Sequence, residues 1–183
     1  MELIVTSSVE DNDGEFWALY QDAFQNLRHQ AVQRHLMYDT EFKEVMLDER
    51  VTKYMVRDAQ TGRLVALSTM TNDLHAVPLV SPEYFQHQYP ELYAQQRIWY
   101  IGFLAVAPDY QGSPAASQLI ERMCADVNAA DGMFVVDICE HRSRRMFAIG
   151  IERMAAQHLP NLKRKRLDAQ VFWGYEFPDA TAA

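Results

Sequence analysis

The stretch that decides the fold is LAVAPDYQGSPAASQLI, which runs from Leu104 to Ile120. It contains the end of a strand, a short turn and the start of a helix. The strand is predicted over IWYIGFLAV, residues 98–106, because aromatic and β-branched residues fill it almost throughout, as in a strand buried on both faces. Pro108 ends the strand, and Pro114 suits the first position of a helix, where a missing N–H costs little.

The helix after Pro114 is predicted to be amphipathic. Its apolar residues recur on one helical face, and they are Ala116, Leu119, Ile120, Met123 and Val127. The first N–H groups of a helix have no partner within it and lie at the positive end of its dipole. A small-residue loop that joins a strand to such a helix therefore predicts an anion-binding site.

This segment resembles the signature of the GNAT acyltransferase superfamily. The residues that carry the resemblance are Val106, Pro108, Tyr110, Gln111, Gly112 and Ala116. In that family the pattern Gln/Arg-x-x-Gly-x-Gly/Ala holds the pyrophosphate of acyl-CoA. Gln111 takes the first place of the pattern and Ala116 the last. Pro114 stands in place of the first family glycine, where it removes one N–H and fixes φ at about −65°.

The resemblance implies acetyl-CoA or another acyl-CoA as the co-substrate. The pantetheine arm of the donor would pair with the backbone of Leu104, Ala105 and Val106. The pyrophosphate would meet the backbone N–H groups of Gln111, Gly112, Ser113, Ala115 and Ala116. The alternative interpretation is that Ser113 is an ordinary helix cap and that the Gln111 side chain faces solvent.

Acyl transfer from a thioester to an amine requires a held donor, a polarised carbonyl, a neutral amine and a proton for the leaving thiolate. Many GNAT members carry a glutamate on the central strand, but residues 99–102 here contain no carboxylate. Tyr100 could line the acceptor site or relay a proton through water. Many members also place a tyrosine on the helix after the next strand, where the nearest residue here is Phe147, which has no proton to give.

Two further candidates for proton transfer follow the predicted strand Met133–Cys139. Glu140 or His141 could accept a proton from an ammonium group, and the alternative is that both are solvated loop residues. Asp137 lies on this strand, where a buried acid would need a partner. Cys124 and Cys139 have no metal-ligand spacing, and we expect no metal.

The remaining elements follow the order that the GNAT resemblance implies. We expect an α/β (α+β) GNAT fold, in which a mixed, mostly antiparallel, twisted sheet has helices on both faces and a central parallel pair of strands. One domain would span residues 1–183. The expected elements are a strand over Glu2–Thr6, a helix from a capping box of Asn12 and Glu15 to about His29, a helix over Thr40–Asp48, a hairpin of Val51–Arg57 and Leu64–Thr71, a strand over Met133–Cys139 parallel to the central strand, a helix over Ser143–His158, and strands over Lys163–Asp168 and Gln170–Phe177.

Residues 72–97 form an insertion that is longer than a hairpin loop needs. A helix capped by Ser81, with Pro82 at its first position, is expected within it. The aromatic residues of the insertion, such as Tyr84 and Phe85, allow two interpretations. They could form a wall or lid over the acceptor or acyl pocket, or they could simply pack on the sheet.

The composition narrows the class of protein. The chain has 183 residues, 49% of them hydrophobic and 23% charged, with a formal net charge of −8. This charge argues against non-specific binding of nucleic acid. Cys124 and Cys139 lie in apolar contexts, which favours reduced, buried thiols. Because the sequence has no leader pattern and no apolar stretch of about 18 residues, we expect no membrane partner and a cytoplasmic location.

One basic run, Lys163–Arg166, stands out in this acidic chain. Such a run is a solvated face, a docking site for an acyl carrier protein or a contact for a CoA phosphate. The apolar segment 170–177 could pair in a homodimer.

We expect an N-acyltransferase that moves an acetyl or other acyl group from acyl-CoA to a primary amine of a small molecule or peptide. The alternatives are a synthase that depends on acyl carrier protein and a non-catalytic GNAT-like binding domain.

Overall fold

The computed structural model describes most of the chain, namely residues 1–11, 13–32, 34, 36–78, 80–139, 153, 155–156 and 162–175. The strands are β1 (Glu2–Thr6), β2 (Thr52–Arg57), β3 (Leu64–Thr71), β4 (Ile98–Val106) and β5 (Met133–Val136). The α-helices are α1 (Glu15–Phe24), α2 (Asp39–Leu47), α3 (Pro82–Gln88), α4 (Pro90–Ala94) and α5 (Ala115–Ala129). Short 3-10 helices span Gln25–His29 (η1), Leu74–Ala76 (η2) and Pro108–Tyr110 (η3).

The strands form one five-stranded sheet in the order β1-β2-β3-β4-β5. The first four strands are antiparallel to their neighbours, whereas β4 and β5 run parallel. This confirms the mixed, mostly antiparallel sheet and the parallel pair joined by α5. Within the described residues, β5 is the last strand of the sheet.

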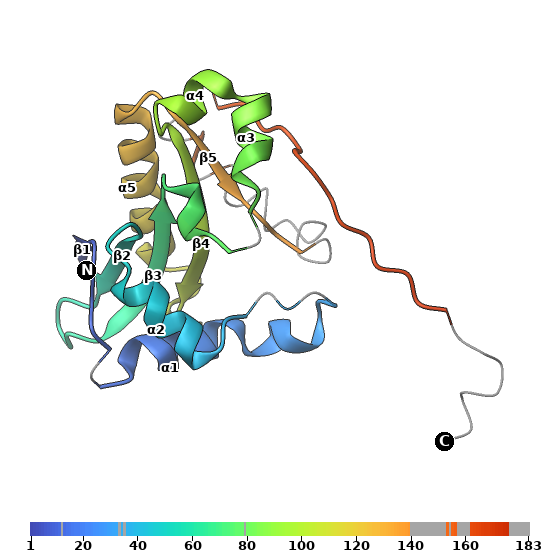
Figure 1. Cartoon of the computed structure of the whole chain (residues 1–183). Coiled ribbons are helices and arrows are strands. Elements are labelled where there is room, and N and C mark those ends of the chain that lie inside the picture. The colour runs from blue at the N-terminus through green and yellow to red at the C-terminus, as the bar shows by residue number, and fades with distance from the viewer. Residues whose placement is uncertain are drawn as a thin grey trace.

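Helices cover both faces of the sheet, as predicted (Figure 1). One face packs against α1 and α2 through a cluster that includes Phe16, Tyr20 and Phe42. The other face packs against α5 through Leu119 and Met123. The strands β3 and β4 therefore lie between two apolar layers, which explains why all eight residues of β3 are buried.

The predicted capping box of α1 is wrong. The helix begins at Glu15 after Gly14, whose φ is 70°, so Glu15 is a first-turn residue and not the third residue after the cap. Asp11 accepts hydrogen bonds from the N–H groups of Phe16 and Trp17 instead. Asn12 lies outside the described residues. The carboxylate of Glu15 contacts the sheet instead, where it accepts hydrogen bonds from Arg57 and from the N–H of Leu64.

The insertion packs over the N-terminal half of β4. Ser81 caps α3 as predicted, because its side chain accepts a hydrogen bond from the N–H of Tyr84. Phe85 is buried together with Ile98, and Tyr89 and Tyr100 pack against the same cluster. The insertion therefore does pack on the sheet, and the cluster that it forms includes the candidate residue Tyr100.

The predicted strands over residues 163–168 and 170–177 are wrong for the part that the structure describes. Residues 162–175 contain no strand. Leu162 and Leu167 pack against the body of the protein, whereas Val171, Phe172 and Trp173 are exposed. A strand needs a partner edge as well as favourable residues, and the four consecutive cations 163–166 lack the alternation that a half-buried strand needs.

Other boundaries differ slightly from the prediction. The strand predicted over 133–139 ends at Val136. Of the helix predicted over 143–158, the described residues are Arg153, Ala155 and Ala156, which are helical. Cys124 is buried and Cys139 is partly buried, and both are free thiols. No helix among the described residues is long and apolar enough to cross a membrane.

Candidate active site

The strands β4 and β5 form a fork. They pair from Ile98 and Met133 to Ile101 and Val136, and there the pairing stops. In contrast, β4 continues beside β3 up to Val106. The edge of β4 that faces away from β3 consequently has no neighbouring strand beyond the fork within the described residues.

A β-bulge lies at the fork. Thr69 pairs with Phe103 and Met70 pairs with Ile101, which leaves Gly102 as the extra residue of β4. A Cβ atom on Gly102 would lie 2.6 Å from Oγ1 of Thr69, which is closer than two such atoms can approach. The bulge therefore requires glycine at this position, and it bends β4 where the two parallel strands part.

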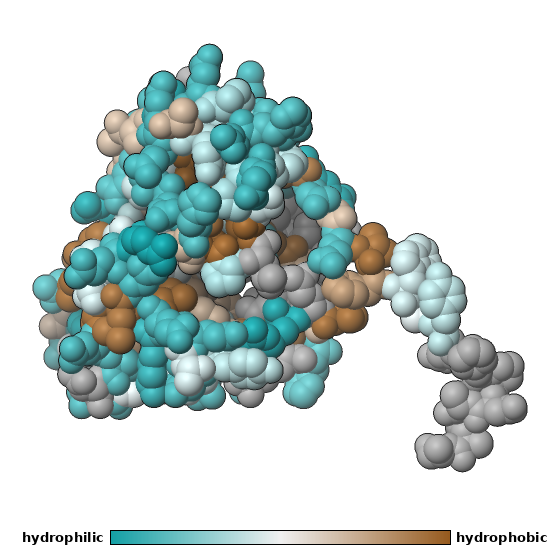
Figure 2. Space-filling view, in the orientation of Figure 1, coloured by the Kyte–Doolittle hydropathy of each residue, from teal (hydrophilic) through white to brown (hydrophobic). Residues whose placement is uncertain are grey.

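The bulge changes which side chains of β4 face each layer. Before it, Tyr100 faces the insertion, and Ile101 faces α5. After it, Phe103 packs with α1 and α2, and Leu104 packs with α5. Figure 2 shows the surface hollowed between the α3–α4 insertion and the layer of α1 and α2, with hydrophobic residues in the hollow. This hollow lies on the face of the sheet that carries Tyr100.

Tyr100 and Asp137 meet at the fork. The hydroxyl of Tyr100 donates a hydrogen bond to Oδ1 of Asp137, the residue that follows β5. Burial of the Tyr100 ring and the nearby carboxylate together raise the pKa of Tyr100, so the phenol keeps its proton. Asp137 is exposed and lies just past the strand, whereas the sequence placed it on the strand. Sequence analysis named Tyr100 as a site residue but did not identify its partner.

The turn after β4 supplies free backbone donors. Gly112 has a φ of 85°, which favours glycine, and Pro114 is the cap residue before α5 rather than its first residue. The N–H groups of Gln111, Ser113 and Ala115 donate within the turn, over 3.4, 3.1 and 3.2 Å. The N–H groups of Gly112, Ala116 and Ser117 have no acceptor within the described part of the chain. They lie at the N-terminus of α5, whose first turn contains no acidic residue.

Two side-chain contacts attach this turn to the β2–β3 hairpin. The hydroxyl of Tyr110 donates to Asp58 over 2.7 Å, and Arg63 forms an ion pair with Asp109 at 2.6 Å. Hydrogen bonds from Tyr110 and from the N–H groups of Thr61 and Gln60 lower the pKa of Asp58 to about 2. Sequence analysis missed this attachment because the partners are far apart in the chain.

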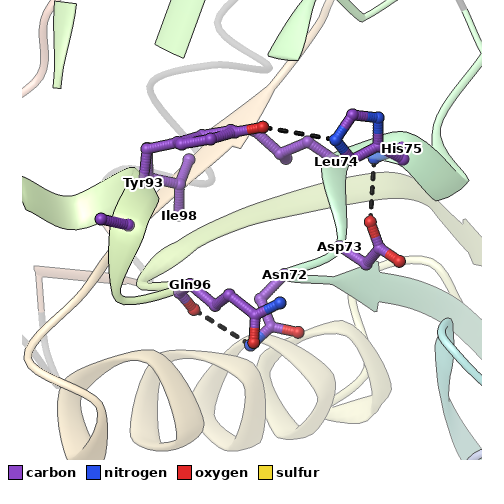
Figure 3. Close-up of a pocket in the computed structure, with 8 residues that line it drawn as sticks. Asn72, Asp73, Leu74, His75, Tyr93, Gln96 and Ile98 are labelled. Carbon is purple, nitrogen blue, oxygen red and sulfur yellow. Dashed lines mark hydrogen bonds between the residues drawn. The ribbon is translucent and has the colours of Figure 1, made fainter. Parts of the chain in front are cut away.

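A separate pocket of about 280 Å³ lies beside the insertion (Figure 3). It is lined by Asn72, Asp73, Leu74, His75, Tyr93, Ala94, Gln96 and Ile98. The hydroxyl of Tyr93 lies 3.3 Å from Nε2 of His75 across it. Because Ile98 begins β4 and the turn follows its end, about 26 Å of strand separate this pocket from the free N–H groups.

The candidates Glu140 and His141, and also Phe147, lie outside the described residues.

The forked parallel pair and the helix N-terminus with free donors lie where the resemblance to acyltransferases implies a donor site. Residues 14–151 match the sequence profile of the GNAT acetyltransferase family. Since this match spans more than half of the chain, the protein belongs to the GNAT acetyltransferase family. No curated protein sequence matches the chain.

Solved structures show the same fold at low sequence identity. An aminoglycoside acetyltransferase from an uncultured soil metagenomic sample has a TM-score of 0.55 and 11% identity, covering 94% of this chain and 96% of the other. A transcriptional regulator from Bacillus halodurans C-125 has a TM-score of 0.56 and 12% identity, covering 94% and 100%. The ribosomal-protein-S18-alanine N-acetyltransferase from Escherichia coli has a TM-score of 0.51 and 16% identity, covering 83% and 75%.

Proposed function

We propose that the protein is an N-acyltransferase that moves an acetyl or other acyl group from acyl-CoA to a primary amine. The observation that carries this proposal is the edge of β4, which has no neighbouring strand beyond the fork within the described residues and leads into a turn whose Gly112 and Ala116 N–H groups have no acceptor there. From Gly102 to Val106 this edge is about 13 Å long. It offers backbone partners to an extended polar arm at Leu104, Ala105 and Val106, and the turn offers donors to a diphosphate.

The residues of the turn fit a pyrophosphate despite Pro114. The proline removes its own N–H, but those of Gly112 and Ala116 remain available. The dipole of the 15-residue helix α5 adds positive potential at the same point. Gln111, Ser113 and Ala115, which the signature also implies, hold the shape of the turn through their internal hydrogen bonds and can share their N–H groups with a ligand.

The amine acceptor is a small molecule or a peptide in this proposal. The aminoglycoside enzyme and the ribosomal-protein enzyme among the structural neighbours are named for one acceptor of each kind. In this proposal the acceptor enters through the hollow between the insertion and the layer of α1 and α2 (Figure 2), on the face of the sheet opposite α5. The protein would lower the barrier by holding the amine close to the thioester and by polarising the carbonyl with backbone N–H groups.

Isothermal titration with acetyl-CoA, and then with a longer acyl-CoA, tests the donor. We expect 1:1 binding in the micromolar range. Ser113→Asp should weaken binding about tenfold or more, because it adds a negative charge while keeping a side chain that can accept the N–H of Ala115. Ser113→Asn keeps an acceptor for the N–H of Ala115 without the charge and is the matched control. Absence of binding, or equal effects of the two variants, would contradict the proposal.

An acyl carrier protein remains the second candidate donor. All four side chains of Lys163–Arg166 are exposed, which leaves this basic run accessible to an acidic partner. Reversing these charges should raise the Michaelis constant for an acylated carrier protein and leave that for free acyl-CoA unchanged. Equal effects on both donors would exclude docking at this run. A non-catalytic binding domain is the third alternative, and acyl transfer to any amine excludes it.

A further inference from the structure

The fork places a carboxylate on the same face of the sheet as Tyr100. Tyr100 pairs with Val135 in the parallel register, and Val135 packs against the cluster of the insertion. Asp137 is two residues further, and side chains two apart in an extended chain point to the same face. The hydrogen bond from Tyr100 to Asp137 agrees with this placement.

The position of this carboxylate matches the expected position of the reacting atoms. If the diphosphate lies at Gly112 and Ala116, the arm of the donor runs back along β4 and its thioester reaches the fork near Gly102. The pairing of β4 and β5 stops at Ile101 and Val136, so the backbone of Gly102 and the side chain of Asp137 border the same opening. Asp137 is exposed to solvent there, and an acceptor can therefore reach it.

A primary amine is protonated near neutral pH and must lose a proton before it can attack. We propose that Asp137 is the general base that takes this proton, and that Tyr100 is a positioning residue that holds the carboxylate at the fork. This inference rests on the proposed function. It also deepens it, because a carboxylate at the fork favours acceptors that arrive as cations.

The proton balance is complete without a further reactant. The ammonium gives one proton to the carboxylate of Asp137, and the neutral nitrogen attacks the thioester carbonyl. The new C–N bond forms, the C–S bond breaks, and the second proton of the nitrogen goes to the departing thiolate. Asp137 then returns its proton to water. Tyr100 keeps its own proton throughout, in agreement with its raised pKa.

Other titratable groups surround this cluster, but they are exposed. On η2, α3, α4 and the segment 162–175, the charged residues and histidines are His75, Glu83, His87, Glu91, Lys163, Arg164, Lys165, Arg166 and Asp168. Among them, His75 contacts Tyr93, Glu83 accepts from Ser81, and Lys165 donates to Tyr89. The Tyr100 hydroxyl donates to Asp137 rather than to any of these groups.

Two amines of nearly the same shape distinguish an effect of a substitution on proton removal from an effect on amine binding. Ethylamine is an ammonium at pH 7, whereas 2,2,2-trifluoroethylamine is largely neutral and needs no base before attack. With acetyl-CoA as the donor, Asp137→Asn should lower kcat/KM for ethylamine by about 10²-fold or more, and that for trifluoroethylamine by about threefold or less. Asp131→Asn is the control, because Asp131 is an exposed acid at the other end of β5 and pairs with Arg97. It should change neither value.

Tyr100→Phe tests the positioning role. It should lower kcat/KM for ethylamine about fivefold to tenfold. Because Asp137 is still present to remove the proton, the ratio of kcat/KM for ethylamine to that for trifluoroethylamine should fall much less than in Asp137→Asn. The dissociation constant of acetyl-CoA should be unchanged in every variant. Equal losses of both amines in Asp137→Asn, or no loss, would overturn the inference while leaving the proposed function intact. A wild-type protein that fails to bind acetyl-CoA, or that binds it and acetylates neither amine, would overturn both.

Discussion

Gly102 approaches Thr69 so closely that a Cβ atom on the glycine would lie 2.6 Å from Oγ1 of the threonine. This contact crosses from β4 to β3 at the bulge, where the pairing between β4 and β5 also ends. The bulge at these two residues therefore coincides with the opening of the fork. Without a side chain at Gly102, the chain can insert one extra residue and still stay hydrogen-bonded to β3.

Gly102→Ala should destabilise the protein by about 1–3 kcal/mol, because the added methyl group forces Thr69 or the backbone to move. The affinity for acetyl-CoA should fall as well, since the bent edge of β4 would shift. Chemical denaturation and titration calorimetry measure the two effects.

A double-mutant cycle gives the control for this prediction. Thr69→Ala removes Oγ1, and the Gly102→Ala/Thr69→Ala pair should therefore lose less stability than the sum of the single variants. Strict additivity of the two changes would show that the close contact is not the reason for the glycine.

Tyr110→Phe should loosen the turn that holds the free N–H groups. The variant loses the hydrogen bond to Asp58 but keeps the ring that lies under Arg63. We expect the dissociation constant of acetyl-CoA to rise about threefold to tenfold, which corresponds to one lost hydrogen bond of about 1 kcal/mol. Calorimetry measures the change. Tyr38→Phe, at an exposed tyrosine beside α2, should have no effect, and an equal effect there would contradict the assignment.

Glu15 stabilises the folded protein, and this stabilisation is lost at acid pH. Its carboxylate accepts hydrogen bonds from Arg57 and from the N–H of Leu64. Burial alone would raise the pKa of Glu15, but these bonds and the charge of Arg57 outweigh it and lower the pKa below 4.5. The stabilisation is present above the unfolded pKa and is lost as the pH falls through the lower folded pKa.

The variant Glu15→Gln should therefore be less stable than the wild type by about 1–2 kcal/mol at pH 7. This difference should shrink as the pH falls below 4.5, where the wild-type carboxylate becomes protonated. Urea denaturation at several pH values measures it. A difference that stays constant down to pH 2 would contradict the role of the ionised carboxylate.

Lys53 gives a dependence of the same sign, but at alkaline pH. Its side chain is fully buried, and Nζ donates to the carbonyl oxygens of Ser7 and Asp48 over 2.7 and 2.6 Å. Burial lowers the pKa of Lys53 from 10.5 to about 8. Below this pH the folded protein holds a buried charge. Between pH 8 and 10.5 the unfolded chain binds the extra proton, so a rise in pH stabilises the fold.

We expect the stability difference between the wild type and Lys53→Met to increase in favour of the wild type by about 2 kcal/mol between pH 7 and pH 10. Comparing the two proteins removes the contribution of all other groups. Denaturation curves at matched ionic strength measure this difference. No change with pH would show that the lysine keeps an ordinary pKa in the folded state.

Much of the fold could be predicted because its patterns are local. The ranges Leu64–Thr71 and Ile98–Val106 were predicted exactly from their apolar and β-branched residues. The helix after Pro114 follows from the spacing of its apolar residues, and the parallel pairing of β4 and β5 follows from the helix that connects them. Each of these signals lies within one element or one connection.

The candidate site was only partly predicted. The signature placed the turn after the central strand, and Tyr100 was named as a candidate on that strand. The sequence could not show which N–H groups of the turn are free, because the turn satisfies several of them itself. It also could not show the partner of Tyr100, because Asp137 meets it only through the register of two parallel strands.

The sequence by itself therefore determined most of the elements from β1 to β5, their order and the family, since a periodic pattern and a short signature depend on neighbouring residues alone. Only the tertiary structure decided the bulge at Gly102, the contacts of Glu15 and the absence of strands over residues 162–175. These features depend on which backbone edge and which side chain lie opposite each residue. Such partners are distant in the chain, and their positions are set by packing and register rather than by local preference.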